Sequence, residues 1–65
     1  MAKKYYQVIV RHLFLDSTGI WDYMEGEYSG VIHSTKADAN RELREANKMI
    51  TDINDYAFIE EIENG

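Results

Sequence analysis

Two histidines are the residues of this chain whose type is best suited to chemistry. His12 lies in the run KYYQVIVRHLFL, and His33 precedes a segment with helical spacing. A histidine can act as a general base when a partner orients it and a cleft admits a substrate. In a strand or at a strand end, a histidine is also typically held by a carbonyl or a carboxylate. We favour this structural interpretation for both and predict no catalytic residue.

Carboxylates gather near the C-terminal end, and they could bind a divalent cation or share a proton. The acidic residues concerned are Asp52, Asp55, Glu60, Glu61 and Glu63. On a strand, Glu60 and Glu61 would point to opposite faces, so they could not act as a direct pair. We therefore expect a solvated, charged edge, with no metal site and no cofactor. A sharper alternative is an acidic docking surface for the lysines and arginines of a partner.

The composition limits the kind of protein this can be. The chain has 65 residues, a net charge of −5 and no cysteine, so we predict a single domain over residues 1–65 without disulfides. An acidic balance disfavours nucleic-acid binding, because phosphate backbones attract basic patches. The longest apolar stretches have only strand length. We expect a cytoplasmic protein with neither a nucleic-acid nor a membrane partner.

The elements that must position these residues begin with a strand over residues 4–15, which are rich in β-branched and aromatic types. A turn at 16–19 leads into residues 20–34. Gly26 and Gly30 mark bulges or a second turn there, which leaves one long strand or two short ones open. The first two strands should form an antiparallel hairpin.

A helix is predicted over residues 35–51, with Thr35 or Ser34 as its N-cap. Its apolar stripe consists of Ala39, Leu43, Ala46 and Ile50. A loop with an inward-facing Ile53 follows, and then a strand over residues 56–62. Since a helical crossover suits parallel neighbours, we expect this last strand to lie parallel beside the first.

The predicted fold class is therefore α+β. A β-hairpin, with three strands if residues 20–34 divide, is followed by one helix and a final strand. The helix packs on one face of a three- or four-stranded sheet.

The sheet face away from the helix is the predicted interaction surface. Alternation along the first strand places Tyr5, Ile9, Leu13 and Leu15 on that face, and one helix cannot cover both sides of a sheet. Exposed apolar faces usually mark contact surfaces, and tryptophan and tyrosine dominate binding hot spots. The predicted surface comprises Tyr5, Ile9, Leu13, Leu15, Trp21 and Tyr23. Its expected partner is another protein or a second copy in a homo-oligomer, most simply a dimer.

Three runs, YYQVIVRH, GEYSGVIHS and STKADANRELREANKMI, together resemble the N-terminal domain of HicB-type antitoxins. The resemblance implies strands followed by a threonine-led helix and a closing strand. It also implies an acidic protein that inhibits a small basic RNase toxin. The chain further resembles short acidic proteins of phages and prophages, through STKADANRELREA and the terminal AFIEEIE.

We expect a small non-catalytic, protein-binding or regulatory module, of which a phage accessory protein is one form. The alternatives are a HicB-like antitoxin and a structural homo-oligomer, and a small enzyme is disfavoured. Fold alone does not decide among these functions.

Overall fold

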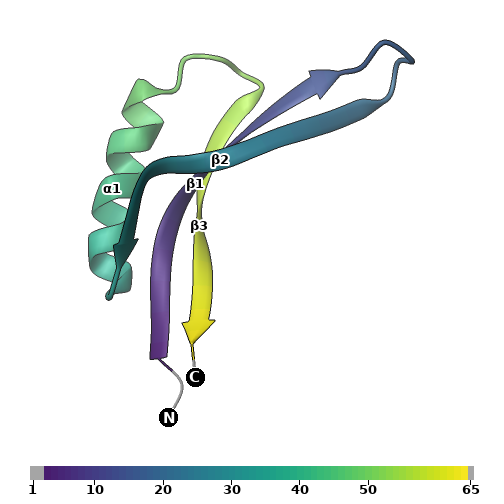
Figure 1. Ribbon diagram of the computed structural model, residues 1–65. Helices are drawn as coiled ribbons and strands as arrows, with labels where there is room; N and C mark the ends of the chain where they lie inside the picture. Colours follow the sequence, from purple (N-terminus) through teal and green to yellow (C-terminus); the bar gives the residue numbers. More distant parts are fainter. Residues whose placement is uncertain (1–2, 65) are drawn as a thin grey trace.

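Strand β1 (Lys3–Leu15) is the centre of the sheet in the computed structural model, which describes residues 3–64. β2 (Trp21–His33) and β3 (Asp55–Asn64) lie on either side of it, in the order β2-β1-β3. The helix α1 (Lys36–Met49) joins β2 to β3 and lies along one face of the sheet (Figure 1). The predicted α+β fold is confirmed, and the described sheet has three strands.

Both neighbours of β1 run antiparallel to it; Tyr6, for example, lies opposite His33 of β2 and Glu61 of β3. The expected parallel pairing of the first and last strands is therefore wrong. The helical crossover does join two parallel strands, but these are β2 and β3, with β1 between them. Since the hairpin already places β2 on one edge of β1, the crossover carries β3 to the other edge.

β2 is one continuous strand with a bulge at Gly30, one of the two glycines predicted to interrupt it, whereas Gly26 lies in regular register opposite Val10. While β1 advances from Gln7 to Ile9, the partner position in β2 moves from Ile32 to Glu27. Gly30 lies within the extra residues at φ 79°, a conformation that residues with a Cβ rarely adopt. β2 bends sharply along its length (Figure 1), as expected of a bulged strand.

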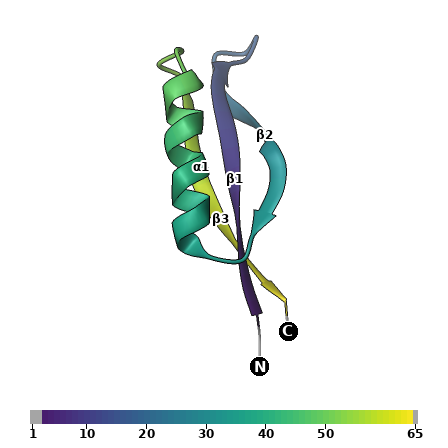
Figure 2. The same cartoon turned by 90° about the vertical axis from the view of Figure 1, so that its left-hand side faces the viewer.

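The helix begins where the sequence predicts, with Thr35 as its N-cap. The Thr35 hydroxyl accepts a hydrogen bond of 3.3 Å from the Asp38 amide, which satisfies one of the free N–H groups of the first turn. Ala39 and Ala46 of the predicted stripe are fully buried. Because alanine side chains are short, they let the helix lie close against the sheet (Figure 2).

The helix covers the sheet face that carries Tyr6 and Val8. His33, opposite Tyr6, reaches Glu42 of α1, and Val8 is fully buried. The opposite face, which we call the open face, carries the alternate residues of β1 and their partners in register. They are Lys3, Tyr5, Gln7, Ile9, Arg11, Leu13 and Leu15 of β1, Trp21, Tyr23, Glu25, Glu27 and Ile32 of β2, and Tyr56, Phe58, Glu60, Ile62 and Asn64 of β3.

The loop between α1 and β3 leaves one of its two isoleucines in solvent. Ile53 is 97% exposed, so the expectation of an inward-facing residue is wrong. The Asp52 carboxylate accepts the Asn54 amide and the Asp52 carbonyl accepts the Asp55 amide, which closes a tight turn. Asp52 thus satisfies the Asn54 and Asp55 amides of the turn, and Ile53 is left exposed to solvent.

Candidate functional site

A two-stranded arm projects beyond the rest of the sheet. β3 begins at Asp55, opposite His12, so the last residues of β1 and the first of β2 pair only with each other. The Leu13 amide makes the final link on the β3 side, donating to the Asn54 carbonyl at 2.9 Å. Figure 1 shows the arm, residues 13–23, extending away from α1 and β3.

The tip of the arm is organised by one carboxylate. Asp16 Oδ1 accepts hydrogen bonds from the Thr18 hydroxyl, the Thr18 amide and the Ile20 amide, at 2.6 to 2.9 Å. The pKa of Asp16 is lowered from its ordinary value, chiefly by the Thr18 hydroxyl and then by the Ile20 amide. Gly19 completes the turn at φ 83°. The ionised carboxylate therefore holds the arm in its hairpin shape.

The arm exposes large apolar side chains on the open face. Register places Leu15 and Trp21 opposite each other there, and Leu13 opposite Tyr23. Trp21 is 62% exposed, Leu15 is 54% exposed and Tyr23 is 51% exposed, while Leu13 is half-buried. We call these four uncharged residues the arm patch. The structure thus brings together four of the six residues of the predicted interaction surface.

The other two predicted residues, Tyr5 and Ile9, lie outside the arm. Ile9 is only 6% exposed, so it is not part of an uncovered surface as expected. It lies in the middle of the central strand, between Glu27 of β2 and Phe58 of β3 in register. Neighbouring side chains of the same face surround such a position even without a second layer. Tyr5 is half-buried beside a pocket of about 480 Å³ at the opposite end of the sheet.

Arg11 forms a cluster on the open face that the sequence did not reveal. Its Nε and Nη2 atoms donate to Glu25 Oε2 at 2.9 and 2.7 Å, and Nη1 donates to the Tyr56 hydroxyl at 2.8 Å. The guanidinium carbon also lies 4.4 Å from the Tyr23 ring centroid and 4.9 Å from that of Phe58. These are cation–π distances. The cluster joins the arm to both outer strands.

Within this cluster, Arg11 keeps its positive charge. The pKa of Arg11 is raised above its ordinary value, first by its hydrogen bond to Glu25 and then by that to Tyr56. The guanidinium therefore stays cationic wherever the protein is folded. Alternation offered the one available signal, because it places Arg11 between Ile9 and Leu13 on the same face of the strand.

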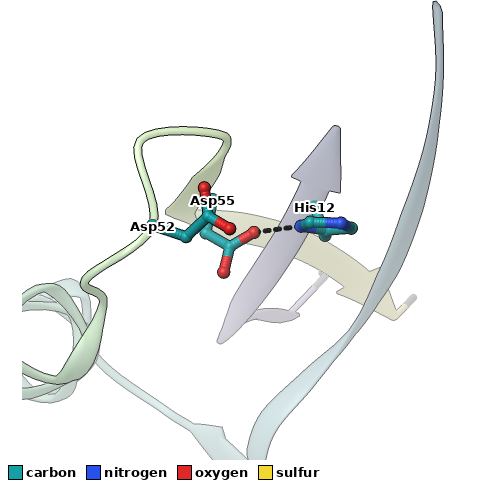
Figure 3. A group of neighbouring side chains, drawn as sticks. All are labelled: His12, Asp52 and Asp55. Atoms are coloured by element: carbon teal, nitrogen blue, oxygen red, sulfur yellow. Dashed lines mark hydrogen bonds and ion pairs between the residues drawn. The ribbon is translucent and has the colours of Figure 1, made fainter. Parts of the chain in front are cut away.

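A second cluster consists of His12, Asp52 and Asp55, whose potential ligand atoms lie within 4.8 Å of one another. Figure 3 shows Asp52 in the loop and Asp55 at the start of β3, with the Asp55 carboxylate directed at the His12 ring. His12 Nδ1 pairs with Asp55 Oδ1. Among the side-chain hydrogen bonds of residues 3–64, the one that His12 makes is to Asp55.

The chemistry open to this second cluster is limited by its exposure. The His12 side chain is about half exposed, and Asp52 already accepts an amide of its own turn. One imidazole and two carboxylates would leave a divalent cation open to solvent on its remaining sides. The His12–Asp55 pair lies opposite in register and closes the end of the β1–β3 ladder. We assign it this structural role.

A third polar pair, His33 and Glu42, joins the end of β2 to α1. His33 Nε2 lies 3.2 Å from Glu42 Oε2, and both side chains are largely buried. The approach has ion-pair distance but lacks hydrogen-bond geometry. Among residues 3–64, neither His33 Nε2 nor the other carboxylate oxygen, Glu42 Oε1, has a hydrogen-bond partner. A pocket of about 220 Å³ adjoins the pair, and Asp38, Arg41 and Glu45 complete its lining.

Comparisons with protein-family models, with curated proteins and with solved structures gave no match for this chain. Among the described residues, no helix has the length and apolarity needed to cross a membrane. The geometry of the arm and of the open face is therefore the basis for a functional assignment.

Proposed function

We propose that this chain is a non-catalytic, protein-binding module whose contact surface is the arm patch. The observation that carries the proposal is the exposure of Leu15, Trp21 and Tyr23 on one face of a projecting two-stranded arm. A two-stranded hairpin is at best marginally stable in water. Contact with a partner would bury these side chains and stabilise the arm.

The residue types of the arm patch suit protein recognition. Tryptophan and tyrosine are enriched at binding hot spots because they bury a large area at a small cost in side-chain entropy. Arg11 and Asp16 hold the arm in a defined shape before binding, which lowers the cost of ordering it. The sequence places no charge within the arm patch itself, so burying it leaves no unpaired ion.

The rest of the surface supports a sharper version of this function, an acidic cytoplasmic inhibitor or phage accessory protein. The net charge is −5, and Glu60, Glu61 and Glu63 lie exposed along the outer strand β3. Carboxylates spaced in this way would be attracted to the basic surface of a nuclease, as the resemblance to HicB-type antitoxins implies. Such an interaction would weaken with added salt, because exposed charges are screened over about 8 Å at physiological ionic strength.

Affinity capture with matched variants tests the arm patch as the contact surface. Immobilised wild type should retain a host protein that Trp21→Lys fails to retain. Met49→Lys, an exposed apolar position on α1, should retain it as well as wild type does. Equal recovery by Trp21→Lys and wild type would show that the arm patch is not the contact surface. Recovery from increasing salt then tests the charge-driven version.

A further inference from the structure

The molecule exposes more surface than its mass requires. It measures 46 × 27 × 13 Å, and its radius of gyration is 13.8 Å, against about 11 Å for a compact domain of this length. Its accessible surface is 5029 Å², whereas a compact monomer of this mass exposes about 4,300 Å². The excess is about 700 Å². Each partner of a standard protein–protein interface buries about 800 Å².

The buried core is correspondingly small. Among residues 3–64 the buried hydrophobic residues are Val8, Ile9, Ala39 and Ala46, and two of these are alanines. The sequence has no cysteine, so disulfides cannot stabilise so thin a core. Chains of this size without disulfides or a structural metal commonly gain stability by oligomerisation. Packing the open face against another sheet would supply the missing second layer.

The distribution of charge favours an identical partner on this face. The open face carries Lys3 and Arg11 against Glu25, Glu27 and Glu60, which sum to −1, while the whole chain carries −5. The remaining −4 therefore lies elsewhere. Two copies that meet through their open faces bring little like charge together, and most of the acidic residues lie away from that interface.

The outer edge of β3 is the poorer site for self-association. A two-fold pairing of β3 strands would bring the carboxylates of Glu60, Glu61 and Glu63 near those of the other copy, which is destabilising. The edge of β2 in the arm is also partly closed, because the Tyr23 amide donates to the Asp22 carboxylate at 2.8 Å. The uncharged arm patch is the better contact region.

From these observations we infer that the arm patch binds a second copy of this chain. The two open faces pack as a sheet-on-sheet dimer with the α1 helices outside. A two-fold interface uses the same surface on both copies, so Trp21 of each protomer contributes to one shared apolar core. The inference rests on the proposed function, because it names the occupant of the same surface.

Sedimentation equilibrium of the purified chain, with two variants of matched exposure, tests the dimer. Trp21 is 62% exposed on the open face, and Met24 is 66% exposed on the opposite face of the same strand. Wild type and Met24→Lys should reach twice the monomer mass as concentration rises. Trp21→Lys should dimerise about a thousandfold more weakly, because a hot-spot loss of about thirtyfold occurs in both copies. Circular dichroism checks that each variant is folded.

The fluorescence of wild type provides a measurement that depends on no substitution. Trp21 is the only tryptophan, so its emission should shift to shorter wavelength as dimerisation removes it from water. A wild-type chain that stays monomeric, with emission independent of concentration, would overturn the proposal that a second copy binds the arm patch. If Trp21→Lys nevertheless loses a captured host protein, the proposed function stands with a different partner. Equal weakening by both variants would overturn the open face as the dimer interface.

Discussion

The guanidinium carbon of Arg11 lies 4.4 Å from the centroid of the Tyr23 ring, across the hairpin from β1 to β2. The same guanidinium donates to Glu25 on β2 and to Tyr56 on β3. Arg11 therefore connects all three strands on the open face, at the point where the arm leaves the sheet. We therefore expect this contact to help fix the orientation of the arm patch.

Replacing Arg11 with lysine should loosen the arm. Lysine keeps the positive charge but cannot donate in a fork to Glu25 and reach Tyr56 at the same time. We expect faster amide hydrogen exchange in residues 21–25 and little change within α1. Arg44→Lys, on the exposed side of the helix, is the control and should match wild type. Unchanged exchange in the arm would show that the cluster does not hold it.

The arm should loosen at acidic pH through Asp16. The folded hairpin lowers the pKa of Asp16, so the carboxylate contributes stability above the ordinary pKa of an aspartate. That contribution is lost as pH falls through the lowered folded value. Trp21 fluorescence, followed from neutral to strongly acidic pH, should report the change. Asp16→Ala should remove this transition, and a variant that titrates like wild type would contradict the assignment.

Enlarging Ala39 should separate the helix from the sheet. Ala39 is fully buried, so Ala39→Leu is expected to lower the free energy of unfolding by about 1–3 kcal/mol through overpacking. Ala37→Leu, two residues earlier and exposed on the same helix, should change it by about 0.5 kcal/mol or less. Urea denaturation measures both. Equal effects would mean that the helix does not lie close to the sheet at Ala39.

Substitutions of His33 and Glu42 should have strongly non-additive effects on the free energy of unfolding. Glu42→Leu leaves the largely buried imidazole without its acidic neighbour and is expected to cost about 1–3 kcal/mol of unfolding free energy. Replacing both residues with leucine should recover most of this loss, because two apolar groups leave no polar atom unpaired. A double-mutant cycle by chemical denaturation measures the coupling. Additive losses would show that the two side chains act independently.

Much of the fold follows from local sequence. Thr35 with Asp38 predicts the helix start, because their hydrogen bond involves residues only three apart. Gly30 predicts the bulge, because its backbone conformation is a property of one residue. The direction of β3 could not be predicted in this way. It depends on which two strands the helical crossover makes parallel, and here these are β2 and β3, with β1 between them.

The candidate site was only partly predictable for a related reason. Alternation along one strand places Leu15 on the open face, but burial depends on neighbours in other strands. Ile9 is buried because Phe58 and Glu27 flank it in register, and that register spans almost the whole chain. The contacts of Arg11 with Glu25 and Tyr56 likewise require all three strands to be aligned.

The register of β1 with β3 also determines how the chain could be reconnected. Lys3 lies opposite Asn64, at the end of the sheet remote from the arm (Figure 1). A short linker between these positions, with new ends opened in the exposed loop at Ile53, would give a circular permutant in which β3 comes first. The order of synthesis would change while every strand kept its neighbour. The tip of the arm lies far from the linker, whereas its base lies beside the new ends, because the Leu13 amide donates to the Asn54 carbonyl.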